Sequence, residues 1–217
     1  VGYVVPQVAK VFAGNKRALP FLTVAMLAIS DFVRNYGWLV LIAIILMTIG
    51  SRIALRNNDM REKFDAAWLN IPLIGKLARG YNAARFASTL AMLATAGVPI
   101  LKSLQAAAMT LNNRAMRSDA LDALVLVREG APLASAIGQK KRFPGIVSMF
   151  ARLGEQTGQL PLMLSRAAKQ LSSEVQRRAL YLATLLEPLL IVTMGLVVML
   201  IVLAVLLPII QLNQLVK

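Results

Sequence analysis

The 217-residue sequence contains no cysteine and no histidine. Without cysteine there is no disulfide and no thiolate nucleophile, and without histidine there is no imidazole base and no common zinc or haem ligand. No G-x-x-x-x-G-K-[ST] motif is present, which excludes a P-loop for ATP. We therefore expect no catalytic site, no metal site and no cofactor in this chain, and we do not expect it to be an enzyme.

Acidic residues are also scarce. Ten Asp and Glu stand against 24 Lys and Arg, so the net charge is +14, while 58% of the residues are hydrophobic and the mean hydropathy is +0.65. A chain that is both apolar and basic must segregate the two kinds of residue along its length. Nucleic-acid binding is the other interpretation of the basic charge, but the cations are scattered rather than gathered on one element, so we do not expect it.

Two long runs lack charge almost completely. No charged residue occurs from Pro188 to Val216, which predicts a transmembrane helix over 188–212. The run 36–55 holds one charge, Arg52, near its end, and its 20 positions cover ~30 Å as a helix, which predicts a second transmembrane helix. A buried helix of a soluble core is the alternative for 36–55. Neither run contains Asp or Glu, which argues against an intramembrane protease or an ion-coupled transporter.

The distribution of cations predicts the orientation. The stretch 51–187 holds 19 Lys and Arg against nine Asp and Glu. By the positive-inside rule, the domain between the two runs is cytoplasmic. The cations near its membrane junctions outnumber those on the opposite side by eight to four: Arg52, Arg56, Arg61, Lys63, Arg166, Lys169, Arg177 and Arg178 against Lys16, Arg17, Arg34 and Lys217.

Helical signals dominate the central domain. The spacing predicts a helix from Tyr81 to Ala96, with a stripe of small residues along it and Gly97 as its stop. Pro99 and Pro132 are expected to start helices, and Asn112 or Asn113 to cap one that stops at Gly130. Phe143-Pro144 introduces a further helix that is expected to run through Gly154 and Glu155. A final helix from about Leu160 is expected to lead into the last run. The small-residue stripe comprises Ala83, Ala87, Ala91 and Thr95.

The segment GEQTGQL, residues 154–160, interrupts the helical pattern. We expect a turn between two packed helices at Gly154 and Gly158, with Glu155 capping amides at the start of the next helix; a contact or ligand role for Glu155 is the alternative. Asp119 and Asp122 lie three residues apart on one helix, where a solvated charged face shared with Arg114, Arg117 and Arg128 is the expected arrangement.

Five features occur in an order that resembles one known family. They are GVPI at 97–100, the Phe143-Pro144 pair, the GExTGxL turn at 154–160, Glu187-Pro188 before the last apolar run, and the run itself. The sequence resembles the C-terminal half of type II secretion system protein F, a family related to the type IV pilus platform proteins. The segment LPFLTVAMLAISDFVRNYGW at 19–38 and the closing LNQL resemble the secretion branch more than the pilus branch.

The resemblance implies an all-α, multi-pass protein of the bacterial inner membrane, with a cytoplasmic antiparallel helical bundle between two transmembrane helices. Because the sequence begins Val-Gly-Tyr, we expect it to be cut from a longer protein. The implied organisation is the end of a preceding span and a periplasmic link at 1–18, an interfacial or periplasmic helix at 19–35, a transmembrane helix at 36–55, the second cytoplasmic domain at 56–187, a transmembrane helix at 188–212 and a periplasmic tail at 213–217.

The resemblance also implies a function, that of a non-enzymatic platform coupling a cytoplasmic secretion ATPase to assembly of a pseudopilus. The implied partners are this ATPase and its membrane-linked associates, pseudopilins, membrane lipids and further copies of the protein. Calcium is associated with the first cytoplasmic domain of some members; Gln159 and the absence of a second carboxylate near Glu155 argue against a metal here. The positions expected to matter structurally or for partners are Gly154, Glu155, Gly158, Lys140, Lys141, Arg142, Glu187 and Pro188.

Other functions remain open at this point. The basic run Lys140-Lys141-Arg142 could meet an acidic partner or anionic lipid, or could be solvated next to a membrane. A platform for a type IV pilus or a related filament is one alternative function. A transporter or membrane enzyme whose active part precedes Val1 is a remote one.

Overall fold

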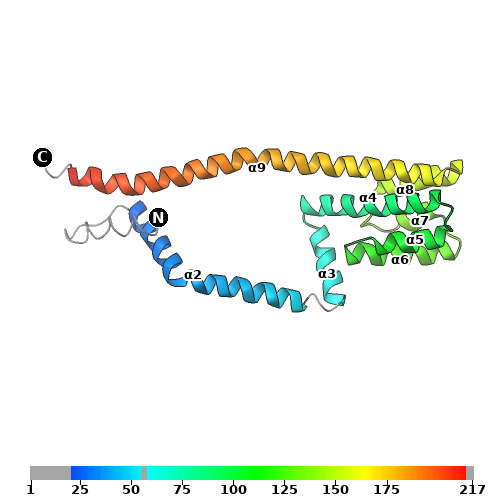
Figure 1. Cartoon of the computed structure of the whole chain (residues 1–217), viewed down its shortest axis with the longest axis horizontal. Coiled ribbons are helices and arrows are strands. Elements are labelled where there is room, and N and C mark those ends of the chain that lie inside the picture. The colour runs from blue at the N-terminus through cyan, green and yellow to red at the C-terminus, as the bar shows by residue number, and fades with distance from the viewer. Residues whose placement is uncertain (1–20, 55–57, 214–217) are drawn as a thin grey trace. The chain divides into compact units, whose positions relative to one another are not determined.

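The computed structural model describes residues 21–54 and 58–213, and every regular element within these ranges is an α-helix (Figure 1). The expected all-α class is therefore confirmed. The helices are α2 (Phe21–Ala54), α3 (Asn58–Leu69), α4 (Ile74–Thr95), α5 (Ile100–Met109), α6 (Arg114–Arg128), α7 (Leu133–Gly138), α8 (Gly145–Thr157) and α9 (Leu160–Asn213).

Local sequence signals explain most helix ends. Pro99, Pro132 and Pro144 each stand one residue before a helix, with an extended backbone conformation. The Oδ1 atom of Asn113 accepts a hydrogen bond from the backbone N–H of Met116 at 3.0 Å, which caps α6 as expected. The stops predicted at Gly97 and Gly130 are confirmed: both residues have positive φ angles, of 78° and 98°, which favour glycine.

The chain divides into two compact units, and residues Arg52–Ala183 form one of them, the helical unit. Helices α3 to α8 and the first part of α9 pack there around one apolar core. The core is rich in alanine, which lets helices approach closely. Its largest fully buried side chains include Phe86, Leu90, Leu104, Leu111, Met116, Ile137, Leu164 and Val147.

Helix α4 carries the predicted small-residue stripe but begins earlier than predicted, at Ile74 rather than Tyr81. Ala83, Ala87 and Ala91 are buried, whereas Thr95 is exposed. A second close approach lies at Gly80, where an added Cβ would stand 2.8 Å from the Cγ2 of Val175 on α9. Helices α4 and α9 therefore touch at a position where only glycine fits without movement.

The second unit comprises the residues up to Ser51 and those from Thr184 onward. Helix α2 runs without a break from Phe21 to Ala54, so the prediction of one helix over 19–35 and a separate helix over 36–55 is wrong in that respect. The reason is local, since nothing between Ser30 and Leu41 prevents helical hydrogen bonding and Gly37 is accommodated inside the helix. Residues 1–18 lie outside the described ranges.

Helix α9 continues past Glu187 and Pro188 to Asn213, so the expectation that the last helix leads into the final apolar run is confirmed. Within the described ranges it is the one helix long and apolar enough to cross a membrane, over Leu160–Ala204, and none of its most apolar window is buried. The apolar part of α2, Asn35–Gly50, is shorter. Its large side chains are nevertheless exposed, for example Leu46 and Met47.

Candidate functional site

The corner between α8 and α9 holds Gly154, Glu155 and Gly158. Helix α8 runs through Gly154 and Glu155, as expected, and ends at Thr157, and the chain turns at Gly158, which has a left-handed conformation with φ 69°. Gly154 therefore serves packing rather than turning. A Cβ on Gly154 would stand 2.6 Å from the Cα of Leu160, which leaves room only for a hydrogen atom.

Glu155 caps backbone amides, as expected, but on a different helix. Its Oε1 accepts from the N–H of Leu133 at 2.5 Å and its Oε2 from the N–H of Ala134 at 3.4 Å. These amides begin α7, not α9, so the predicted helix was wrong. The N-cap residue of α7 is Pro132, which has no side chain able to accept a hydrogen bond, and Glu155 supplies the missing acceptor across the α7–α8 contact.

Replacing Glu155 with alanine should leave two amides at the start of α7 without a protein acceptor. We expect a loss of about 1–2 kcal/mol in the free energy of unfolding, the usual range for a lost cap or charge-assisted hydrogen bond. Amide hydrogen exchange at Leu133 and Ala134 should accelerate, and thermal unfolding in detergent should begin earlier. Glu155→Gln keeps one acceptor oxygen and should lose less. The neighbouring exposed Gln156→Ala is the control, and an equal effect there would contradict the capping role.

Both aspartates of α6 pair with cations of the basic run. Lys140 Nζ lies 2.7 Å from Asp122 Oδ2, and Arg142 Nη1 lies 2.8 Å from Asp119 Oδ1. The expected solvated face is wrong for Asp119, which is buried and whose partner comes from the α7–α8 link, whereas Asp122 is exposed as expected. Two of the three cations in the basic run are already neutralised by the chain.

The other predicted positions stand apart from this cluster. Lys141 is exposed, and no ion pair of its side chain occurs within the described ranges. Glu187 and Pro188 are exposed on α9, in the other compact unit. In the part of the chain that the structure describes, no three carboxylates lie close enough to hold a metal ion.

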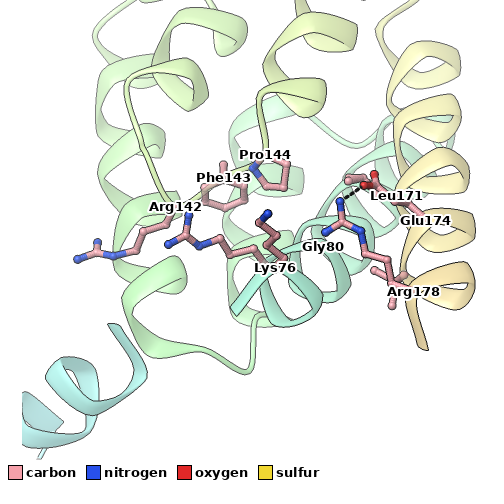
Figure 2. Close-up of a pocket in the computed structure, with 10 residues that line it drawn as sticks. Lys76, Gly80, Arg142, Phe143, Pro144, Leu171, Glu174 and Arg178 are labelled. Atoms are coloured by element: carbon pink, nitrogen blue, oxygen red, sulfur yellow. Dashed lines mark hydrogen bonds and ion pairs between the residues drawn. The ribbon is translucent and has the colours of Figure 1, made fainter. Parts of the chain in front are cut away.

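A basic pocket opens between α4, the start of α8 and α9, with a volume of about 260 Å³ (Figure 2). Phe143 and Pro144 form part of its wall, and the ring of Phe143 packs on Phe86, 5.1 Å between centroids. Gly80, where α4 meets α9, also lines it. The charged side chains around it are Lys76, Arg79, Arg142, Arg178 and Glu174.

The pocket has more positive charge than its partners neutralise. Arg178 pairs with Glu174, as the dashed line in Figure 2 marks, and Arg142 pairs with Asp119. Lys76 has no such partner within the described ranges. Arg79 donates from Nη2 to the backbone oxygen of Leu69 at 3.1 Å and to Asn70 Oδ1 at 3.3 Å, both neutral acceptors, while its buried Nε finds none among the described residues. Two positive charges therefore remain, an arrangement suited to a carboxylate or another anion.

Comparison with known proteins reveals the family. The family described as type II secretion system (T2SS), protein F matches residues 86–208. The type II secretion system protein F of Pseudomonas aeruginosa is 41% identical over 216 residues, which is 100% of this chain and 53% of that protein. The chain belongs to the type II secretion system protein F family. The protein F of Vibrio cholerae is 34% identical, over 98% of this chain and 52% of that protein.

Pilus proteins are also similar to this member of the protein F family. The type IV pilus assembly protein PilC of Thermus thermophilus is 32% identical over 94% of this chain and 51% of its own length. The chain thus spans about half the length of the curated relatives it matches. Four of the five features that carried the resemblance, from Gly97 to Pro188, lie within the range that the family matches, and the last apolar run begins within it and extends past residue 208.

The basic pocket of this protein F family member was not predicted from its sequence. Lys76 and Arg178 are about one hundred positions apart, and no motif links them. One local signal was present, because the pair Glu174 and Arg178 stands at the i,i+4 spacing that favours an ion pair on a helix. That spacing identifies a salt bridge but not the pocket that the pair borders.

Proposed function

We propose that the chain is part of a multi-pass, non-enzymatic platform in the bacterial inner membrane, on which a type II secretion system assembles its pseudopilus. In this proposal residues 56–187, which include most of the helical unit, form a cytoplasmic antiparallel bundle between transmembrane helices at 36–55 and 188–212. In the same proposal, residues 1–18 are the end of a preceding span and a periplasmic link. Residues 19–35 belong to an interfacial or periplasmic helix, and residues 213–217 are a periplasmic tail. Membership of the protein F family supports this assignment.

The observation that supports the proposal most is the continuity of α9. One helix, Leu160–Asn213, contains both the last part of the helical unit and an exposed apolar stretch. Every exposed Leu, Ile, Val or Met of that stretch costs free energy in water and is favourable in hydrocarbon. A force applied to the helical unit by an ATPase would therefore reach the membrane through a hydrogen-bonded helix rather than through a loop.

The proposed partners are the secretion ATPase and its membrane-linked associates on the cytoplasmic side, pseudopilin helices along the spans, lipids, and further copies of the platform. Three exposed cations on different elements are available to acidic partners: Arg85 on α4, Lys141 in the α7–α8 link and Lys169 on α9. Arg85 and Lys169 border one groove of about 590 Å³ between α4 and α9. No cofactor is proposed for this chain.

The proposal predicts which positions meet the ATPase in cells. A photoreactive residue placed in the full-length protein at position 85, 141 or 169 should capture the secretion ATPase or a membrane-linked associate, identified by mass spectrometry. The same residue at position 214, proposed to be periplasmic, is the control and should capture neither. Failure at all three positions in cells that still secrete, or capture from position 214, would contradict the proposal.

A type IV pilus platform is the second candidate, supported by the similarity to PilC over most of this chain. The photocrosslinking experiment described above distinguishes the two candidate functions, because the captured ATPase belongs either to a secretion system or to a pilus system. The segment 19–38 and the closing LNQL, which resemble the secretion branch, favour the first.

A further inference from the structure

Helix α3 exposes an apolar stripe that the platform function does not explain. Met60, Phe64 and Trp68 stand at intervals of four residues, so they share one face of the helix. Their side chains are 54%, 50% and 43% exposed, and the rings of Phe64 and Trp68 stack with centroids 6.1 Å apart. Exposing three large apolar side chains in a row is costly in water, so this face, which we call the α3 stripe, is expected to have a partner.

The opposite face of α3 shows that the stripe is not simply an unfinished part of the core. Leu69 is buried, at 2% exposed. Asp65 is anchored at the start of α6, where its Oδ2 accepts from the N–H of Arg114 at 2.8 Å and its backbone oxygen accepts from Asn113 Nδ2 at 2.9 Å. These contacts prevent α3 from rotating about its axis, so the stripe points away from the helical unit.

The charges on α3 are arranged around the stripe in a definite way. At about 100° per residue, Arg61 lies beside Trp68 on one edge and Lys63 lies beyond Met60 on the other, and both are exposed. Glu62 and Asp65 fall on the docked half of the helix. The edges of the stripe are thus cationic and the carboxylates of Glu62 and Asp65 are turned away from it, the pattern of a helix that lies on an anionic lipid surface with its cations reaching outward to headgroups.

The exposed apolar surface continues past the end of α3. Ile71, Leu73 and Ile74 are 38%, 57% and 43% exposed. Leu73 leads into a groove of about 660 Å³ with both apolar and cationic walls: Pro72, Leu73, Lys76, Leu77, Arg177, Arg178, Tyr181 and Leu182. The mixture of aliphatic, aromatic and cationic side chains matches the boundary between headgroups and acyl chains, where Trp and Tyr concentrate.

We propose that the α3 stripe lies in the headgroup region of a bilayer containing anionic phospholipid, and that it holds the helical unit against the membrane surface. A bilayer fits better than a protein partner because three side chains and a short link are far fewer than the ~20–30 residues that each side of a stable protein interface contributes. The inference rests on the proposed membrane insertion of α2, since the few residues from Ala54 to Asn58 reach only ~14 Å even when extended and so keep α3 near the bilayer.

Fluorescence quenching in proteoliposomes tests this placement. A variant of the full-length protein is made in which Trp38 and every other tryptophan except Trp68 is replaced by phenylalanine. It is reconstituted in phosphatidylcholine with phosphatidylglycerol. Trp68 should be quenched at least ~twofold more by lipids brominated near the headgroup end of the acyl chain than by iodide in the water. In a Phe64→Ser or Met60→Ser variant the ratio should fall toward one. In the starting variant, lipid quenching of Trp68 should increase with the phosphatidylglycerol content of the vesicles. The double substitution Arg61→Gln and Lys63→Gln should abolish that increase.

Two controls separate the possible failures. The first control is a separate variant in which Val198→Trp, in the proposed span, supplies the single tryptophan in place of Trp68. Its quenching reports on membrane insertion itself. If lipid quenches that tryptophan while iodide alone quenches Trp68, the α3 proposal is overturned and the platform proposal stands. If lipid quenches neither, membrane insertion fails as well. Protection of Trp68 from both quenchers, together with crosslinking between copies through Met60→Cys, would assign the stripe to a protein contact and overturn the lipid proposal.

Folding is monitored separately, because a misfolded variant could also lose its lipid contact. The stripe is exposed, so Phe64→Ser and Met60→Ser should leave the unfolding temperature in detergent almost unchanged. A loss of lipid quenching with an unchanged unfolding temperature supports the proposal, whereas unchanged quenching in both variants contradicts it.

Discussion

Replacing Phe86 with alanine should destabilise the helical unit by about 3–5 kcal/mol. Phe86 is fully buried on α4, and its ring packs on that of Phe143 with centroids 5.1 Å apart and planes at 60°. Truncation removes buried apolar area and leaves a cavity at the centre of the core. Since domains are usually stable by only about 5–15 kcal/mol, a large part of the total is lost. Thermal or urea unfolding of the full-length protein in detergent, followed by circular dichroism, measures the change.

The matched control is the same substitution at Phe64, which is 50% exposed on α3. It should cost less than about 1 kcal/mol, because little buried area is lost. Equal shifts for the two variants would mean that Phe86 is not part of a closely packed core. Because Phe143 also lines the basic pocket, Phe86→Ala should in addition loosen the pocket wall.

Replacing Gly154 with alanine is expected to have the second largest effect. The added methyl carbon would stand 2.6 Å from the Cα of Leu160, and this obstacle is backbone, which cannot move aside by changing a rotamer. The start of α9 must shift relative to α8, and overpacking of this kind costs about 1–3 kcal/mol. The same unfolding measurement applies, and hydrogen exchange should rise at the α8–α9 corner.

Gly145→Ala on the same helix is its control. A Cβ there meets nothing within 4 Å. Alanine should therefore be neutral or stabilise α8 by up to about 1 kcal/mol, since it restricts the unfolded chain and favours a helix. If Gly154→Ala were as harmless as Gly145→Ala, the close approach of α8 and α9 at Gly154 would not exist in solution.

The accuracy of the sequence predictions depended on how local each signal was. The boundaries of α5 to α8 were predicted well because Pro99, Asn113, Pro132 and Pro144 act on their own backbone neighbours. The first part of α4 was missed for the opposite reason. It contains Gly75 and Gly80, poor helix formers that are tolerated there because each meets a distant or neighbouring segment at close range.

The site residues show the same division. The sequence predicted that the Glu155 carboxylate would cap amides, but the amides it meets lie 22 and 21 positions earlier in the chain. The sequence shows a basic run at 140–142 but does not show what its cations meet. The partners of Lys140 and Arg142 are decided by the packing of the α7–α8 link on α6. Packing likewise brings Lys76 and Arg79, which have no carboxylate partner within the described ranges, to one pocket with Arg142 and Arg178.

The amino-acid sequence by itself determined the helical class, the long apolar run in α9 and the family of this protein, because helix periodicity, hydropathy and short motifs are properties of neighbouring residues. Only the tertiary structure decided which helix Glu155 caps, which cations remain unpaired and which face of α3 is left exposed. Those outcomes depend on contacts between residues far apart in the chain, where a few ångströms in packing determine whether a charge is paired and whether an apolar side chain is covered.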